Sequence, residues 1–129
     1  MIPEDKPTFV LDSVRVWFES PTLLCVSARA HEQVSAADAV KIMSWAVETT
    51  KGERYKVLYI PEKGSNVSPE LRAMLADPER AKRIIADAMV VASFPHRLLA
   101  DFYLRFNKPA VATKLFSNEE AARRWLETV

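Results

Sequence analysis

The sequence predicts an α/β domain with a mostly parallel sheet. Three observations support this prediction. Helix-like and strand-like patterns alternate from residue 35 to the end of the chain, as in folds with right-handed crossovers. The segment 87–93, DAMVVAS, is a nearly continuous apolar run, which is typical of a central parallel strand. The length of 129 residues matches one domain, and no repeat or linker divides residues 1–129.

A hairpin is predicted near the N-terminal end of the chain. In the segment 13–20, SVRVWFES, residues alternate as in a half-buried strand. One face of this strand carries Val14, Val16 and Phe18, and the other carries Arg15, Trp17 and Glu19. Pro21 presets a turn, and the apolar segment 23–30, LLCVSARA, supplies the second strand. A further short strand is expected at residues 8–11, before the hairpin.

Two tryptophans leave alternatives open. Trp17 lies on the polar face of its strand, where it either marks an interface or is covered by the N-terminal segment. Trp45 lies off the main apolar stripe of the helix that contains it, and the same two alternatives apply.

Capping residues mark where the first helices begin. Ser35 and Asp38 form a capping box, and Gly52 ends the helix that follows. The segment 55–60, YKVLYI, is then predicted to be a strand. The residues Ser-Pro-Glu at 68–70 start a second helix. That helix must be short, because Asp-Pro-Glu at 77–79 repeats the start signal.

The last third of the chain is predicted to form a helix, a strand and a closing helix. The helix spans residues 95–106, with Leu98, Leu99, Phe102 and Phe106 on its inner side and Arg97, Asp101 and Arg105 on its outer side. The segment 110–116, AVATKLF, forms the strand. Ser117 caps the closing helix and Glu120 completes a capping box, and the buried stripe of that helix consists of Ala122, Trp125, Leu126 and Val129.

Composition and charge narrow the function classes. The 18 basic and 17 acidic residues give a net charge of +1, so no global attraction to nucleic acid or to an anionic membrane is expected. Two glycines are too few for a phosphate-binding loop or a dinucleotide fingerprint. The basic cluster of Arg80, Lys82 and Arg83 is interpreted as a solvated face, because no exposed aromatic residues are interleaved with it.

The single cysteine and the N-terminus indicate a cytoplasmic protein. Cys25 lies in an apolar run, so we expect a buried and inert thiol rather than a nucleophile or a disulfide partner. The segment 1–10 contains acids and two prolines and lacks the apolar core of a signal peptide. No run is long enough to cross a membrane.

The second half of the chain resembles a known family. A strand is followed by a Ser-x-x-x-Arg-Leu helix, an Asn-Lys-Pro turn, a Thr-Lys-Leu-Phe-Ser strand end and an acidic helix start that leads to Trp-Leu. The residues that match are Ser93, Arg97, Leu98, Asn107, Lys108, Pro109, Thr113, Lys114, Leu115, Phe116, Ser117, Glu119, Glu120, Trp125 and Leu126. This pattern is similar to the stand-alone members of the bacterial STAS-like, SpoIIAA-like family.

The resemblance implies a SpoIIAA-like (STAS) fold, with a four- to five-stranded, mostly parallel sheet, an N-terminal hairpin and helices mainly on one face. It also implies a regulatory role, because the best-studied members are anti-sigma factor antagonists that bind an anti-sigma kinase. In those proteins a serine at the start of a helix is phosphorylated. The corresponding loop here, residues 61–72, offers Ser65 and Ser68 in place of the usual Asp-Ser-Ser-Gly. The more distantly similar CRAL-TRIO lipid carriers imply ligand binding instead.

Candidate site residues follow two strands of the predicted sheet. Ligands of open α/β sheets bind beyond the carboxyl ends of the strands. The candidates after the first strand are Lys63, Ser65, Asn66 and Ser68, and those after the second are Ser93, His96 and Arg97. The simpler alternative is that Ser68 and Ser93 only cap helices and that Arg97 pairs with Asp101.

From these observations we expect a non-enzymatic, cytoplasmic domain that binds a protein partner and forms a homodimer. A phosphorylated Ser65 or Ser68 would switch the partner. The alternative is a domain that binds a lipid or an anionic metabolite, with Phe102 and Tyr103 lining a pocket and Arg97 holding the charged head. No catalytic residue, cofactor or metal is predicted, because His31, His96 and Cys25 lack metal-ligand spacing.

Overall fold

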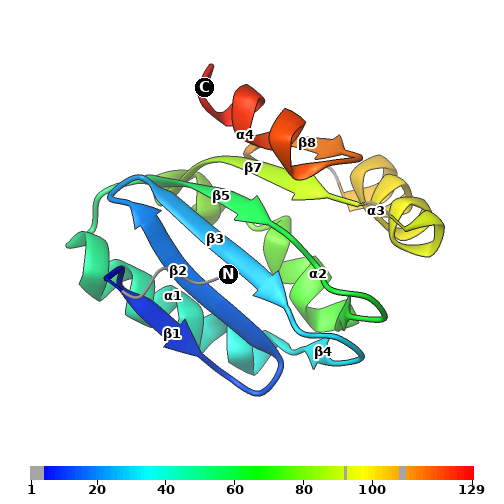
Figure 1. The fold of residues 1–129 in the computed structure, drawn as a ribbon, viewed down its shortest axis with the longest axis horizontal. Coiled ribbons are helices and arrows are strands. Elements are labelled where there is room, and N and C mark those ends of the chain that lie inside the picture. The colour runs from blue at the N-terminus through cyan, green and yellow to red at the C-terminus, as the bar shows by residue number, and fades with distance from the viewer. Residues whose placement is uncertain (1–4, 92, 108–109) are drawn as a thin grey trace.

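A six-stranded sheet forms the centre of the computed structural model, which describes residues 5–91, 93–107 and 110–129 (Figure 1). In spatial order the strands are β1 (Thr8–Val10), β2 (Val14–Ser20), β3 (Leu23–Ala28), β5 (Tyr55–Tyr59), β7 (Ile84–Val90) and β8 (Ala112–Phe116). The pairs β1–β2 and β2–β3 are antiparallel, and the pairs from β3 to β8 are parallel. The predicted hairpin and mostly parallel sheet are confirmed.

Helices cover both faces of this sheet (Figure 1). One face carries α1 (Ala36–Thr50), α2 (Pro69–Leu75) and the 3₁₀ helix η1 (Pro78–Lys82), and the other carries α4 (Glu119–Leu126). The helix α3 (Phe94–Asn107) stands beyond the carboxyl end of β7. Two short strands, β4 (Gln33–Val34) and β6 (Asn66–Val67), pair in parallel and join the loops that follow β3 and β5.

The strand predicted at residues 8–11 forms β1, so the sheet has six strands, one more than the five that the resemblance allows. The Phe9 ring of β1 stacks on Trp45 at 5.7 Å. Helices lie mainly on one face, as expected, and the apolar stripe of α4 packs on the other face, which carries Trp17, Cys25 and Leu58.

The two ambiguous tryptophans are both packed inside the protein. Trp17 is only 6% exposed and belongs to the core under α4, so its interpretation as an interface residue is wrong. The alternative prediction is that the N-terminal segment covers Trp17. Residues 1–4 of that segment lie outside the described residues. Trp45 contacts the rings of Phe9 and Phe18. Cys25 is fully buried, and desolvation raises the pKa of its thiol to about 12, as expected for an inert cysteine.

Helix α3 has the predicted position but not the predicted packing. Leu98 and Phe102 are 55% and 59% exposed, although the sequence predicts them on an inner side. The reason is that α3 extends past the sheet edge instead of lying over a sheet face (Figure 1). The side chains of Leu99 and Phe106 lie outside the described residues.

Capping explains the ends of the other helices. Ser35 and Asp38 form the predicted capping box, and Ser68 accepts a hydrogen bond from the Leu71 amide at 3.1 Å. Asp77 caps η1, so the second start signal does terminate α2. Asn118 rather than Ser117 caps α4, because its side chain accepts from the Ala121 amide at 2.8 Å.

An ion cluster fastens α4 to the sheet. The Arg123 guanidinium donates to both carboxylate oxygens of Glu19 on β2 and, through Nε, to Glu119 at 2.8 Å. The Lys56 ammonium donates to the Leu126 carbonyl at the end of the helix, at 2.5 Å. An isolated helix of this length is unstable in water. These bonds hold α4 at a fixed place over the core.

Gly64 offers a test of how the loops after β3 and β5 fit together. Gly64 and Gly52 both have left-handed backbone angles, with φ of +76° and +85°. A Cβ at Gly64 would lie 2.3 Å from Nδ1 of His31, whereas a Cβ at Gly52 would meet nothing within 4 Å. Gly52→Ala should therefore cost about 1 kcal/mol of unfolding free energy, and Gly64→Ala about 1 kcal/mol more. Urea denaturation measures both, and a His31→Ala background should remove the difference.

Candidate ligand-binding cavity

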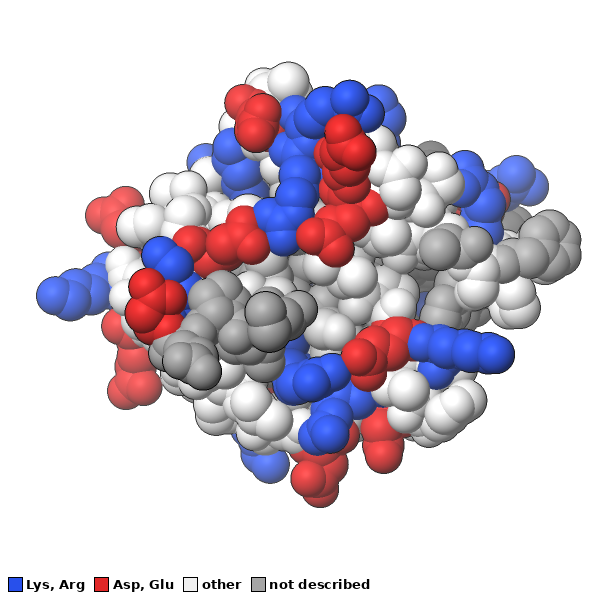
Figure 2. Space-filling model, viewed as in Figure 1, with Lys and Arg blue, Asp and Glu red and all other residues white. Residues whose placement is uncertain are grey.

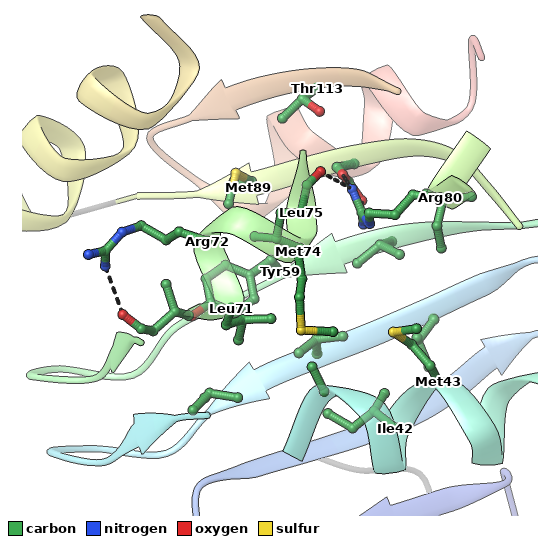
Figure 3. Close-up of a pocket in the computed structure, with 18 of the residues that line it drawn as sticks. Ile42, Met43, Tyr59, Leu71, Arg72, Met74, Leu75, Arg80, Met89 and Thr113 are labelled. Carbon is green, nitrogen blue, oxygen red and sulfur yellow. Dashed lines mark hydrogen bonds and ion pairs between the residues drawn. The ribbon is translucent and has the colours of Figure 1, made fainter. Parts of the chain in front are cut away.

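A cavity of about 240 Å³ lies between the sheet and the helices α1 and α2 (Figure 3). The strands β3, β5 and β7 form its floor, and the two helices with η1 form its roof. This is the same face of the sheet that carries the larger hydrophobic core. The helices thus cover the sheet without filling the space beneath them.

The middle of the cavity is apolar. Met43 from α1 and Met74 from α2 direct their side chains into the space between the helices, and Tyr59 rises from β5 (Figure 3). Ile42 and Leu71 complete this part of the wall. Burial raises the pKa of the Tyr59 phenol to about 12, so this side chain is neutral at physiological pH. An apolar wall of this kind suits a hydrocarbon or aromatic group.

The polar residues cluster at the end of the cavity where β5 and β7 begin. Arg80 binds both oxygens of Asp87, with Nη1–Oδ2 and Nη2–Oδ1 distances of 2.9 and 3.2 Å. Both side chains are close to fully buried. Arg83 also lines the cavity, and its buried Nε has no hydrogen-bond partner. Tyr55 lies nearby, and burial raises its pKa while the charges of Arg83 and Arg80 oppose that rise.

The opposite end of the cavity is formed by the loop after β5 and the start of α2. Ser65 and Asn66 line it, and Arg72 donates from Nη1 to the Val67 carbonyl at 2.8 Å. The dashed line in Figure 3 shows that the Arg72 guanidinium points away from the two methionines. Its charge is therefore directed toward the loop.

The predicted site residues after β5 are divided between the surface and the interior. Lys63 and Asn66 are exposed, whereas Ser65 and Ser68 are buried. The Ser65 hydroxyl donates to the Glu62 carbonyl at 2.7 Å. Ser68 caps α2, as the simpler alternative predicts.

This loop is bound to the segment that follows β3. The Glu62 amide donates to the Ala28 carbonyl at 2.8 Å, the His31 amide to the Lys63 carbonyl at 3.1 Å, and the Asn66 amide to the Glu32 carbonyl at 3.0 Å. These hydrogen bonds tie the β5 loop to the chain after β3.

The candidates after β7 do not line the described cavity. Ser93 and Arg97 are exposed, and the Ser93 carbonyl accepts from the Arg97 amide at 3.0 Å. Phe102 is exposed as well and does not line this cavity, so the pocket of Phe102, Tyr103 and Arg97 stays a prediction. The side chains of His96 and Tyr103 lie outside the described residues.

The sequence does not predict Arg80, Arg83 and Asp87 as site residues. It predicts a solvated face for Arg80 and Arg83, but Arg80 pairs with Asp87 and Arg83 lines the cavity. Only Lys82 of that cluster is solvated, where it pairs with Glu79. The available signal was Asp87 itself, a charge that begins an apolar run and therefore needs a partner.

The surface gives no strong signal for other ligand classes. Figure 2 shows acidic and basic side chains interspersed over the described part of the face that carries α4. Within residues 5–91, 93–107 and 110–129, no group of three His, Cys, Asp or Glu side chains could hold a metal ion. In the same ranges, no helix is both long enough and apolar enough to span a membrane.

The Arg80–Asp87 pair should be costly to break and cheap to replace. Asp87→Asn keeps the shape of the side chain but leaves the Arg80 charge buried and unpaired, so we expect a loss of about 3 kcal/mol in unfolding free energy. The double variant Arg80→Met/Asp87→Leu removes both charges and should lose much less. Chemical denaturation of the three proteins measures this, and equal losses in both variants would show that the pair contributes little.

Comparison with solved structures identifies the fold. The chain is similar to a Shewanella loihica protein of the DUF3478 family, whose crystal structure is described as uncharacterised with a SpoIIAA-like fold. The TM-score is 0.56 at 12% sequence identity, and the match covers 98% of both chains. The fold is therefore SpoIIAA-like, as the sequence resemblance implies. No curated protein sequence matches the chain.

A family model matches most of the chain, over residues 16–129. The match includes every strand and helix described above except β1 and the first two residues of β2. The chain therefore belongs to the family described as a domain of unknown function, DUF7793.

Proposed function

We propose that this domain binds a small molecule with an apolar body in the cavity between the sheet and α1 and α2. The observation that carries the proposal is the 240 Å³ cavity with an apolar middle and charged side chains at its ends. The cavity is partly open to solvent, so water contacts part of its apolar wall. An apolar ligand that displaces this water would be stabilised by the burial of apolar surface.

The wall chemistry supports binding rather than catalysis. Asp87 is engaged by Arg80 through both carboxylate oxygens, and the phenol of Tyr59 is held neutral by burial. Neither is placed as a free general base. We therefore propose a non-enzymatic domain, and its one buried thiol fits the cytoplasmic location predicted from the sequence.

Filling the cavity should abolish binding without unfolding the protein. Ala39 lines the cavity from α1, and Ala39→Leu adds three carbon atoms there with almost no change in helix propensity. Thermal shift and native mass spectrometry with a panel of small alcohols, carboxylates and aromatic compounds should show binding to the wild type. The Ala39→Leu variant should bind at least tenfold more weakly.

Ala37 supplies the matched control, because it lies on the same helix and is exposed. Ala37→Leu adds the same atoms outside the cavity and should bind as the wild type does. A panel in which no compound binds the wild type, or in which both variants bind equally well, would contradict the proposal.

A protein partner is the second candidate function. Leu98 and Phe102 are four residues apart on α3, so they share one side of the helix, and both are exposed. Such apolar pairs are found where an apolar segment of a partner binds. The regulatory role of anti-sigma factor antagonists that the sequence resembles is of this type. Homodimers that use the same pair are included in this proposal.

Phosphorylation would act on this binding only after a local opening. Ser65 and Ser68 are both buried, so a kinase would need to displace the loop after β5. A phosphate on Ser68 would lie at the N-terminus of α2, where the helix dipole tolerates it, and would change the surface charge of this loop. Mass spectrometry of the protein from its own cells tests whether either serine is modified.

Replacing the exposed apolar pair should weaken partner binding. Leu98→Ser/Phe102→Ser removes apolar surface from α3 and should reduce capture of a defined partner, or self-association in analytical ultracentrifugation, at least tenfold. Val40→Ser/Val47→Ser changes two exposed residues of α1 and serves as the control. Unchanged binding in the α3 variant would remove α3 from the interface.

A further inference from the structure

We propose that the cavity ligand carries a carboxylate that binds Arg83, on an apolar body of roughly ten non-hydrogen atoms. This inference rests on the proposed function and names the chemical class of its ligand. It is carried by the place of Arg83 in the cavity wall, by the lack of an ion-pair partner for Arg83 among the described residues and by the cavity volume.

The position of Arg83 follows from the local fold. Asp77 starts η1, the 3₁₀ helix ends at Lys82, and β7 begins at Ile84. Arg83 is the single residue between them, and its own amide donates to the Arg80 carbonyl at 2.9 Å. Its carbonyl accepts from the Tyr55 amide at 3.0 Å. The backbone of Arg83 is thus fixed on both sides at the end of the cavity.

The side chain of Arg83 has an unsatisfied donor. Its Nε is buried and has no hydrogen-bond partner. A buried N–H without an acceptor is costly, and most buried polar groups in proteins are paired. Nε itself has almost no accessible surface, so a ligand in the cavity would meet Arg83 through the terminal nitrogens of its guanidinium. A carboxylate is the acceptor that matches the planar guanidinium best.

Among the three arginines of the cavity wall, Arg72 and Arg83 form no ion pair with a described acidic residue. The cavity wall contains Arg72, Arg80 and Arg83 and two carboxylates, those of Asp77 and Asp87. Both oxygens of Asp87 are bound by Arg80. Asp77 is exposed, and its Oδ1 accepts from the Glu79 amide at 3.0 Å. In the described part of the chain no acidic side chain forms an ion pair with Arg83.

Arg72 is the weaker candidate for the same role. Its guanidinium donates to the Val67 carbonyl at 2.8 Å and points away from the cavity centre (Figure 3). A ligand whose head binds Arg83 would extend between Met43 and Met74 toward the loop after β5. This orientation places the apolar body against the apolar wall and the charge at the end where β5 and β7 begin.

The volume sets the size of the ligand. An engineered cavity of about 150 Å³ holds one benzene molecule, so a cavity of 240 Å³ accommodates roughly ten non-hydrogen atoms. A medium-chain fatty acid such as octanoate has this size, and so does an arylpropionate. Because the cavity is partly open to solvent, this size describes the part of the ligand that the cavity encloses.

Calorimetric titration of the full chain with octanoate and with octan-1-ol tests the proposal. The two probes have similar apolar bodies and differ in the head group. The wild type should bind octanoate at least tenfold more tightly, because a charged hydrogen-bonded pair forms only with the carboxylate. R83M should bind octanoate no more tightly than octan-1-ol. R124M, which changes an exposed arginine of α4, should behave as the wild type.

The possible outcomes separate this inference from the proposed function. Equal binding of both probes to the wild type would overturn the carboxylate and leave the apolar site in place. Tighter binding of octyl phosphate than of octanoate would overturn the carboxylate in favour of a phosphate head. No binding of any of the three probes would overturn both proposals. If R83M does not fold, the comparison of probes on the wild type still decides the outcome.

Discussion

The contact between Arg80 and Asp87 is the interaction on which this end of the molecule depends. Asp87 projects from β7 into a space that is otherwise apolar, and a carboxylate there is tolerated only if a cation meets it. The cation comes from η1, which exists because Asp77 and Pro78 stop α2 and start a new turn. The ion pair therefore fixes η1 over the sheet, and with it Arg83.

The two faces of the sheet solve the packing problem differently. Under α4, Ala86, Ala88 and Ala122 allow helix and sheet to approach closely, and the Arg123 cluster closes the edge. Under α1 and α2 the wall residues are larger and more flexible, and the helices stand over a cavity. The face under α4 is therefore closely packed, while the face under α1 and α2 contains the cavity.

Local signals in the sequence were sufficient for most of the fold and for little of the site. The caps at Ser35 and Ser68 depend on neighbours within three residues, so the sequence predicts both. The sequence also predicts β1, whereas the position of α4 depends on which distant surface is left uncovered, and no short pattern encodes that.

The site was missed for the same reason. Asp87 and Arg80 are only seven residues apart, but they meet because a 3₁₀ helix folds back over the strand. A cavity is a space that side chains leave unfilled. Its volume depends on the spacing between the sheet, α1 and α2. The sequence predicts an inner side for α3, but Leu98 and Phe102 on that side are exposed. An amphipathic pattern identifies an apolar face and does not identify the surface that covers it.

The two methionines in the cavity roof have a consequence for selectivity. Met43 and Met74 are unbranched and flexible, so the wall that they form can follow the outlines of different hydrocarbon groups. Arg83 is held through its backbone on both sides and offers a fixed point of attachment. A site with an arginine at one end and flexible methionines in its wall would discriminate strongly between ligand head groups and weakly between the shapes of their apolar chains. Such a domain would respond to a class of metabolites as a pool, rather than to a single compound.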